Sequence, residues 1–405
     1  MLTPTYLWYV PEKAEKQAEE LHNKITAVII ERMMIRLGRG ADYIFTPIDK
    51  WQIAVLQDAG YILQAVQKEI AQATKVNLNE IKRTMQEAGI KAIEWDDAIY
   101  KKAGLEPTPL GESPYLQRLL QRNIEKTNGE MNNYTGTMPN ACHDNYIEAV
   151  DKAYNQTASG TTGYTQAVKE AVEEIIDKGA DVTYPSGRRD SIETATARAV
   201  RTGVSQMSAD ITNARMDEMN WDIILTSAHL GARIGNGGDN LTNHFWWQGK
   251  FYSKSGKDSR FLPFSVCGMG NVQGIHGANC RHSHGPGDGI NNPFEDYDSE
   301  ENRKEYEKRK RQRELERRIR KTKRQLIGMK TAVDNAKDEA LKHELDMEYQ
   351  KKAALLQKQN KAYNDYCKQN NLKTQNERLN TAGWNRGQAS SARGAATRYN
   401  NARGK

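Results

Sequence analysis

The sequence predicts a mainly α-helical protein that contains one compact α+β core. Apolar residues recur at helical spacing along most of the 405-residue chain, which is the pattern of amphipathic helices. Glycine, aromatic and histidine residues concentrate between 229 and 290, as in a small domain of short strands and turns. We therefore expect four parts: a helical N-terminal region (1–179), the α+β core (180–298), a basic long helix (299–366) and a disordered basic tail (367–405).

The N-terminal region is predicted to be a series of amphipathic helices separated by helix breakers. The first helix covers 11–37, where Pro11 suits the first turn. The second begins with Thr46 as its N-cap and ends at Gly60. Further helices are expected at 61–73, 77–88 and 92–103. Another follows the breaker-rich link 106–114, and the breaker GTMPNACHD separates it from a helix at 144–154. The last helix of this region covers 164–179 and ends at Gly179.

The core region predicts short strands around one long helix. After 180 we expect a short strand, a turn at Pro185–Gly187 and an alanine-rich helix. The segments DIILTSAHLGAR and FWWQGKFYSKSG follow, and both are expected to be strands. In the second one, the aromatic side chains would alternate across the strand and pack a small core; they are Trp246, Trp247, Phe251 and Tyr252.

The C-terminal third predicts a basic helix with a weak heptad seam, in the manner of a coiled coil. The seam steps by four and three residues: Leu315, Ile319, Thr322, Leu326, Met329, Val333, Ala336 and Ala340. The final segment is rich in Asn, Gly, Ala, Ser and Arg, which is typical of chain that stays disordered until it binds a partner.

Composition excludes several classes of protein. Mean hydropathy is −0.83, and no stretch approaches the roughly 18 consecutive apolar residues that a membrane helix needs. The N-terminus has neither the basic nor the apolar region of a signal peptide. Four widely spaced cysteines are too few for a disulfide framework. Dinucleotide-binding and phosphate-loop glycine motifs do not occur, so nucleotide binding has no support.

The distribution of charge predicts contact with a polyanion. Net charge is +7, yet residues 303–324 alone hold thirteen Lys and Arg against four Glu, so the rest of the chain is near −2. No base-reading motif is present, and we expect non-specific contact with double-stranded DNA or an acidic partner. The alternative is a solvated helix face. The residues predicted to make this contact are Arg309, Arg311, Arg317, Arg318 and Arg320.

The segment GIHGANCRHSHGPGDG (274–289) predicts a candidate zinc site. Its ligands would be His276, Cys280 and His282, because zinc prefers imidazole and thiolate, with Cys267 or His244 closing the tetrahedron. The paired C-x-x-C of zinc ribbons is missing. The simpler alternative is a glycine-rich loop held by hydrogen bonds, in which case the chain has no cofactor.

A second alternative is a metal-dependent nuclease or injected effector built on the histidines. It would use His229, His244, His276 and His282. Nucleases of the His-Asn-His type need a histidine-bearing helix after their hairpin, and Pro286 and Pro293 oppose a helix after the histidine-rich loop. We therefore predict no catalytic residues and no enzymatic activity.

Four blocks of the sequence, taken in order, resemble the tailed-phage minor capsid protein 2 family, which is related to the Mu F-like minor head proteins. The blocks are YPSGRRDSIETATARAVRTGVSQ, SAHLGAR, WWQGKFYSKSG and GIHGANCRHSHGPGDG. The Mu F-like signature is a Trp-Gln/Glu-Gly-Lys strand followed by a His-x-x-Cys-Arg-Cys loop. Here one more residue precedes the cysteine, and histidine replaces the second cysteine. The corresponding core signature is His229, Arg233, His244, Trp247, Gly249, Lys250 and Arg281.

The resemblance implies a small Mu F-like α+β domain and a structural role in a phage. Such a protein lies inside the head of the virion, and in the host cytoplasm during assembly. Its expected partners are the portal protein, the scaffold or major capsid protein, and packaged DNA. It would aid head assembly or DNA ejection. The helical N-terminal region is the candidate for binding the portal.

Overall fold

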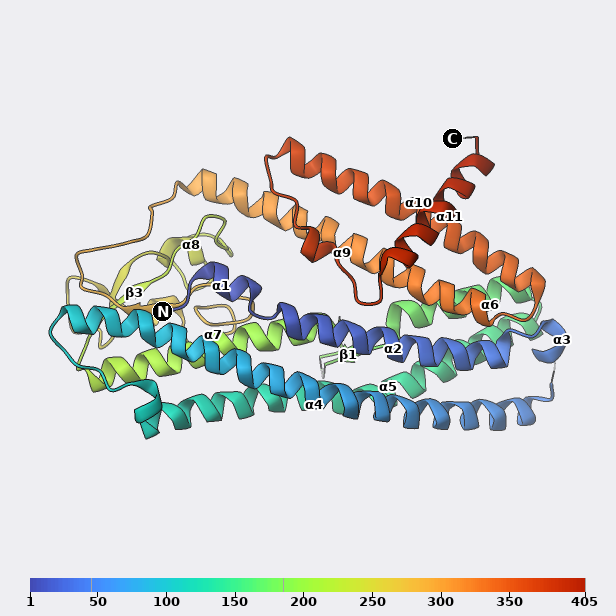
Figure 1. The fold of residues 1–405 in the computed structure, drawn as a ribbon, viewed down its shortest axis with the longest axis horizontal. Helices are drawn as coiled ribbons and strands as arrows, with labels where there is room; N and C mark the ends of the chain where they lie inside the picture. Colours follow the sequence, from blue (N-terminus) through green and yellow to red (C-terminus); the bar gives the residue numbers. More distant parts are fainter. Residues whose placement is uncertain (45, 185, 405) are drawn as a thin grey trace. The chain divides into compact units, whose positions relative to one another are not determined.

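The computed structural model describes residues 1–44, 46–184 and 186–404. Pro185, in the predicted turn, and Lys405, at the end of the predicted tail, lie outside the described residues. The fold is mainly helical with a small mixed sheet (Figure 1), which confirms the predicted fold class. Among the described residues, no helix is both long enough and apolar enough to span a membrane.

The chain forms two compact units, and each is assembled from three separate segments. Unit 1 comprises Met1–Glu15, Val76–Asn132 and Thr196–Lys310. Unit 2 comprises Lys16–Lys75, Asn133–Ala195 and Arg311–Lys405. The division into four consecutive parts stays a prediction, because several long helices contribute residues to both units.

The helices of the N-terminal half are fewer and longer than predicted. The α-helices are α1 Pro4–Tyr9, α2 Glu12–Leu37, α3 Ala41–Ile44, α4 Ile48–Lys102, α5 Pro114–Ala158 and α6 Tyr164–Lys178, with a 3-10 turn, η1, at Leu110–Glu112. The predicted helices at 11–37 and 164–179 correspond to α2 and α6. The predicted breaks within 48–102 are wrong, as is the break at GTMPNACHD.

Burial explains why these breakers fail to end the helices. Gly60 costs α4 about 1 kcal/mol relative to alanine, but its neighbours Val55, Ala59 and Ile62 are fully buried. Pro139 lies inside α5, where it removes one backbone hydrogen bond. Met138 and Cys142 on either side of it are buried in the core of unit 2. Packing of the apolar faces thus outweighs the local preference of glycine and proline.

The sheet of unit 1 has the strand order β5-β4-β3-β6. Strand β3 pairs antiparallel with both β4 and β6, while β4 and β5 are parallel. The helix α7 (Ile192–Glu218) precedes it, and a separate two-stranded ladder joins β1 and β2. The strands are β1 Asp181–Thr183, β2 Arg189–Ser191, β3 Ile223–Thr226, β4 Phe251–Ser253, β5 Leu262–Pro263 and β6 His284–Pro286, with a 3-10 turn, η2, at Phe264–Cys267.

The tryptophans predicted to alternate on a strand lie instead on a one-turn helix, α8, at His244–Trp247. The Asn243 side chain caps α8 by accepting from the backbone N–H of Trp246. The expected small core does form in unit 1. Its members include Tyr100, Trp247, Tyr252, Phe264, Cys267 and Cys280.

The predicted single helix over 299–366 is two helices, α9 (Ser299–Asn335) and α10 (Glu339–Gln369). The seam residues from Leu315 to Ala336 are buried in unit 2, whereas Ala340 beyond the break is exposed. The break needs neither glycine nor proline. Asp338 caps α10 by accepting from the backbone N–H of Leu341 at 2.8 Å.

The predicted disordered tail is wrong over 367–404. After α10 ends there is a 3-10 turn, η3, at Asn376–Leu379, followed by the helix α11 at Arg386–Ala402. The physical reason is that α11 buries one alanine face, Ala392, Ala395 and Ala396, as it packs against α10. Alanine is the best helix former, so a segment of polar composition still forms an ordered helix.

Candidate metal centre and basic surface

Three loops meet at one end of the sheet in unit 1. Strand β3 ends at Thr226. Strand β4 begins shortly after α8, and strand β6 begins at His284. Leu225 faces Phe251 in the register, and Thr226 faces His284. Because β4 and β6 both run antiparallel to β3, the end of β3 and the beginnings of its two neighbours lie together. This topology gathers histidines that are far apart in the sequence.

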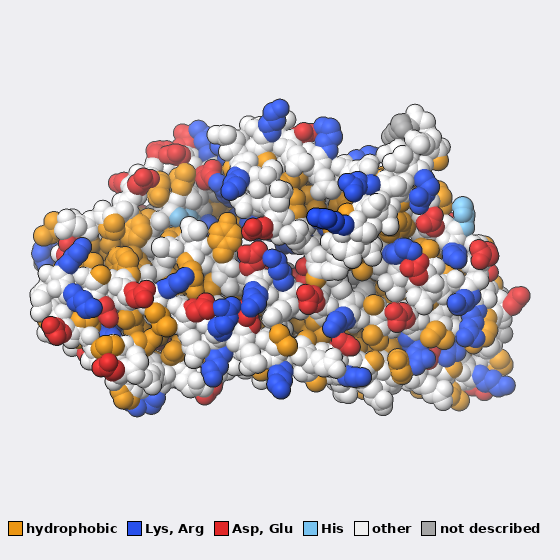
Figure 2. All heavy atoms as spheres, in the orientation of Figure 1, with side chains coloured by type: hydrophobic (Ala, Val, Ile, Leu, Met, Phe, Trp, Pro, Cys, Tyr) orange, Lys and Arg blue, Asp and Glu red, His pale blue; other side chains and the backbone are white. Residues whose placement is uncertain are grey.

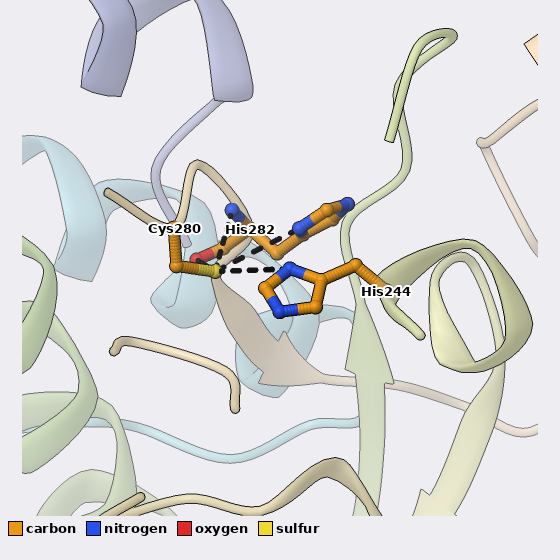
Figure 3. Close-up of side chains that lie close together, drawn as sticks. All are labelled: His244, Cys280 and His282. Carbon is orange, nitrogen blue, oxygen red and sulfur yellow. Dashed lines mark hydrogen bonds between the residues drawn. The ribbon is translucent and has the colours of Figure 1, made fainter. Parts of the chain in front are cut away.

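His244, Cys280 and His282 form a buried cluster at this end of the sheet (Figure 3). The Sγ of Cys280 lies 3.7 Å from Nδ1 of His244 and 3.7 Å from Nδ1 of His282. The three side chains are at most 2% exposed. The structure therefore brings together two of the three predicted zinc ligands with His244, which the sequence offered as a fourth.

His276, the other predicted ligand, takes part in a different set of contacts. Its Nδ1 lies 2.8 Å from Oγ of Ser205, and its Nε2 lies 2.8 Å from Nδ1 of His284. Nε2 of His284 in turn lies 3.0 Å from Oδ1 of Asn213. Both ends of this chain of contacts are on α7. Cys267, also considered as a ligand, is buried on η2 and is not in the cluster.

Several signature residues pack around the cluster. The ring of His229 stacks on that of His282, with centroids 4.5 Å apart. The Trp247 ring lies against both cluster histidines, 4.5 Å from His244 and 4.8 Å from His282. Arg233 donates from Nη2 to the carbonyl oxygen of Ala278, at 3.1 Å, and so fastens the loop that carries Cys280.

The remaining signature residues support neighbouring backbone and aromatic rings. Gly249 has φ of +62°, where a side chain is strained, and an added Cβ would come within 3.1 Å of Cβ of Ala228. The Lys250 ammonium lies 5.8 Å from the centre of the Trp246 ring, and the Arg281 guanidinium lies 4.5 Å from that of Trp8. These contacts give the signature a packing role.

Sequence reasoning missed two residues that orient the cluster histidines. Oε1 of Gln248 lies 2.9 Å from Nε2 of His282, and the carbonyl oxygen of Gln273 lies 2.8 Å from Nε2 of His244. Gln248 stands in the Trp-Gln-Gly-Lys block, so the resemblance contained a signal for it. Gln273 acts through its backbone, which no side-chain pattern could reveal.

Burial holds the histidines of the cluster in the neutral form. Desolvation lowers the pKa of His244 to about 4 and lowers the pKa of His282 well below its ordinary value. Desolvation also raises the pKa of the Cys280 thiol, against the effects of backbone hydrogen bonds and of Arg233 and Arg281. Neutral imidazole is the form that binds metals, so this set of atoms is chemically able to hold an ion.

The predicted arginines of α9 are largely engaged within the protein. Arg309 pairs with Glu305 at 2.6 Å, and Arg311 and Arg318 both pair with Glu314, at 2.6 and 2.5 Å. Arg320 donates to the carbonyl oxygen of Arg378 at 2.7 Å. Arg317 is exposed on the same helix. Four of the five predicted arginines therefore have partners within the protein.

A second basic segment lies on α11, in the part expected to be disordered. Arg386, Arg393 and Arg398 are exposed on this helix, and no acidic residue follows Glu377 in the sequence. On the face drawn in Figure 2, Lys and Arg side chains are interspersed with Asp and Glu. Helix α11 is thus a segment where positive charge is not balanced by acidic neighbours in sequence.

Comparison with known proteins supports the resemblance described above. The family model described as Phage minor capsid protein 2 matches residues 2–366. A search of curated proteins and a search of solved structures each find no match. The match covers nearly the whole chain, including both units and the His/Cys cluster. The chain belongs to the phage minor capsid protein 2 family.

Proposed function

We propose that this protein is a structural component of the interior of a phage head, which binds the portal protein and contacts packaged DNA without sequence specificity. The observation that carries the proposal is the family match over residues 2–366. The long helices and the two buried cores are consistent with a structural role. No step of the proposal requires catalysis.

The burial of the histidines supports a structural role over the nuclease alternative. Three of the four histidines of that alternative, His244, His276 and His282, are at most 3% exposed, so a phosphodiester cannot reach them in this conformation. His229 is only partly buried. Beyond β6 the described chain forms no helix until Ser299, so the histidine-bearing helix of that nuclease class has no counterpart. We expect supercoiled plasmid to stay intact with this protein and zinc or magnesium. Cleavage that disappears in His244→Ala would contradict the proposal.

The decisive experiment compares purified virions with procapsids by quantitative mass spectrometry. We expect this chain in both particles at a few copies, in a constant ratio to the portal protein. After DNA ejection in vitro, the emptied heads show whether the chain stays behind or leaves with the DNA. Absence from procapsids and virions would contradict a role as a head component.

A further inference from the structure

The orientation of Gln248 determines which nitrogen of His282 carries the proton. The backbone N–H of His229 donates to Oε1 of Gln248 at 3.1 Å. A backbone N–H is only a donor, so the atom facing it must be the oxygen of the amide and not its nitrogen. The same Oε1 lies 2.9 Å from Nε2 of His282. Nε2 therefore carries the hydrogen, and Nδ1 of this neutral imidazole has a free lone pair.

His244 is held in the same tautomer by a different acceptor. Its Nε2 lies 2.8 Å from the carbonyl oxygen of Gln273, which can only accept a hydrogen bond. Nε2 must then carry the hydrogen, which leaves Nδ1 as a lone pair. Metal-binding histidines commonly donate their other ring N–H to a carbonyl or carboxylate oxygen, because that bond fixes the ring and its tautomer.

Both free nitrogens point at the same sulfur atom. Sγ of Cys280 is 3.7 Å from each Nδ1, and it also lies 3.8 Å from the carbonyl oxygen of His282. The single thiol hydrogen faces three acceptors, the two Nδ1 atoms and this carbonyl oxygen, and it can form a hydrogen bond to only one of them at a time. Buried acceptors without donors are costly, so hydrogen bonding within the cluster leaves a deficit that a cation would remove.

The two sulfur-to-nitrogen distances fit zinc. Zinc binds thiolate at about 2.3 Å and imidazole at about 2.0–2.1 Å, so a tetrahedral ion places sulfur and nitrogen about 3.6 Å apart. The two measured distances are 3.7 Å. Mixed nitrogen and sulfur donors favour zinc over magnesium or calcium, which take oxygen ligands.

The surroundings of Cys280 also support a thiolate. The backbone N–H of His282 donates to Sγ at 3.4 Å. A hydrogen bond to the charged form of a group stabilises that form. This contact suits the thiolate that remains once a metal ion replaces the thiol proton.

We propose that Nδ1 of His244, Sγ of Cys280 and Nδ1 of His282 bind one Zn²⁺ as three of its ligands. The thiol releases its proton to solvent as the zinc–sulfur bond forms. The ion ties α8 to the loop 268–283, in which the described chain has no helix or strand. Its role is to hold this loop in place, and it is independent of the portal and DNA contacts proposed above.

Metal content of the purified full-length chain tests the site. After removal of metal with a chelator and dialysis against zinc, elemental analysis is expected to find one zinc per chain. Cys280→Ser should lower this at least tenfold. The matched control is Cys267→Ser, another buried thiol in the same unit, which should keep one zinc. Zinc that is absent from the wild type, or retained by Cys280→Ser, would overturn the assignment.

Cobalt spectroscopy identifies the ligands even if a variant folds poorly. Co²⁺ in the wild type and in Cys267→Ser should show a sulfur-to-cobalt charge-transfer band and the strong visible absorption of a tetrahedral ion. A folded wild type that lacks this band in excess cobalt would overturn thiolate ligation. Chelation should also lower the Tm of the protein, by several degrees if free zinc is near a thousand times its Kd. An unchanged Tm would overturn the role in holding the loop.

Discussion

Two glutamates, Glu19 and Glu193, share one arginine in the core of unit 2, and their pKa values shift in opposite directions. The Arg324 guanidinium bonds to Glu193, while its Nη1 lies 3.6 Å from Oε1 of Glu19. The pKa of Glu193 is lowered, although burial alone would raise it, because Arg324 and His22 oppose burial. Desolvation raises the pKa of Glu19 to about 7, against a backbone hydrogen bond from Ala382. A neutral glutamate beside a charged one relieves their repulsion.

The raised pKa of Glu19 predicts a pH-dependent cost to stability. The folded state holds the proton that the unfolded state loses above its ordinary pKa of 4.5, so this group lowers stability as pH rises from about 4.5 to 7. Glu19→Gln removes the effect. The free energy of unfolding of this variant, relative to wild type, should be larger at pH 8 than at pH 4, by up to about 3 kcal/mol.

Chemical denaturation at the two pH values measures this difference. His22, whose pKa burial lowers to about 4, contributes the opposite dependence, because the unfolded state takes up a proton that the folded state refuses. His22 is present in both proteins, so the difference in stability between Glu19→Gln and wild type isolates the effect of residue 19. A variant whose stability relative to wild type is the same at both pH values would contradict a protonated Glu19.

At the scale of elements, α4 shows why helix breakers were misleading. Gly60 lies inside this helix, and a Cβ added there meets no atom within 4 Å. Gly60→Ala should therefore stabilise the protein by about 0.5–1 kcal/mol through helix propensity alone. Thermal or denaturant unfolding measures the change. A loss of stability would indicate that the chain breaks at Gly60, as the sequence pattern suggested.

The matched control is Gly328 on α9, also in a helix of unit 2. A Cβ there would come 2.7 Å from Cγ1 of Ile176 and 3.3 Å from Cδ1 of Ile30. Gly328→Ala should destabilise the protein by about 1–3 kcal/mol, because overpacking outweighs the gain in propensity. If Gly60→Ala raises the free energy of unfolding and Gly328→Ala lowers it, the effect of helix propensity is separated from that of packing.

At the scale of the whole molecule, the basic helices predict a salt-dependent contact with DNA. Arg386 and Arg393 are seven residues apart on α11 and are exposed. Replacing both with Gln should weaken binding to duplex DNA and reduce the slope of log affinity against log salt by about 2, if each neutralises one phosphate. The measurement is a titration at several salt concentrations.

The comparison for this test is Arg311→Gln with Arg318→Gln on α9. Both guanidiniums pair with Glu314, so their loss should change the slope by less than 1. An equal or larger effect of this pair would place the DNA on α9, as the sequence predicted. No change in either variant would contradict DNA contact by these arginines.

The portal contact is predicted to involve exposed apolar side chains at the start of α4. Ile48, Ile53 and Leu56 are each more than half exposed, and clustered apolar exposure marks binding surfaces. Ile53→Asp with Leu56→Asp should abolish co-purification with the portal protein while leaving the fold intact. Gln57→Asp on the same helix is the control. Unchanged co-purification would exclude this surface.

Deletion of residues 1–110 is a less informative test of portal binding, because it removes parts of both units.

Much of the fold and part of the site were accessible from the sequence. Helical periodicity predicted α2 and α6, and the seam from Leu315 to Ala336 is buried as expected. The residue types of the His/Cys loop pointed to zinc chemistry, and Cys280 and His282 do lie together. His276 was included because it is close in sequence, yet its ring faces Ser205 and His284. Separation along the chain does not report the direction of a side chain in an irregular loop.

The sequence by itself determined the helical class, the basic segments and the family, because periodicity, charge and ordered motifs are local properties of the chain. Tertiary structure decided which helices run through glycine and proline, that the tail folds on α10, and that His244 joins Cys280. These outcomes depend on burial between segments far apart in the chain. Pairing of β3 with β4 and β6 brings His244 across 36 residues to Cys280, which no local pattern encodes.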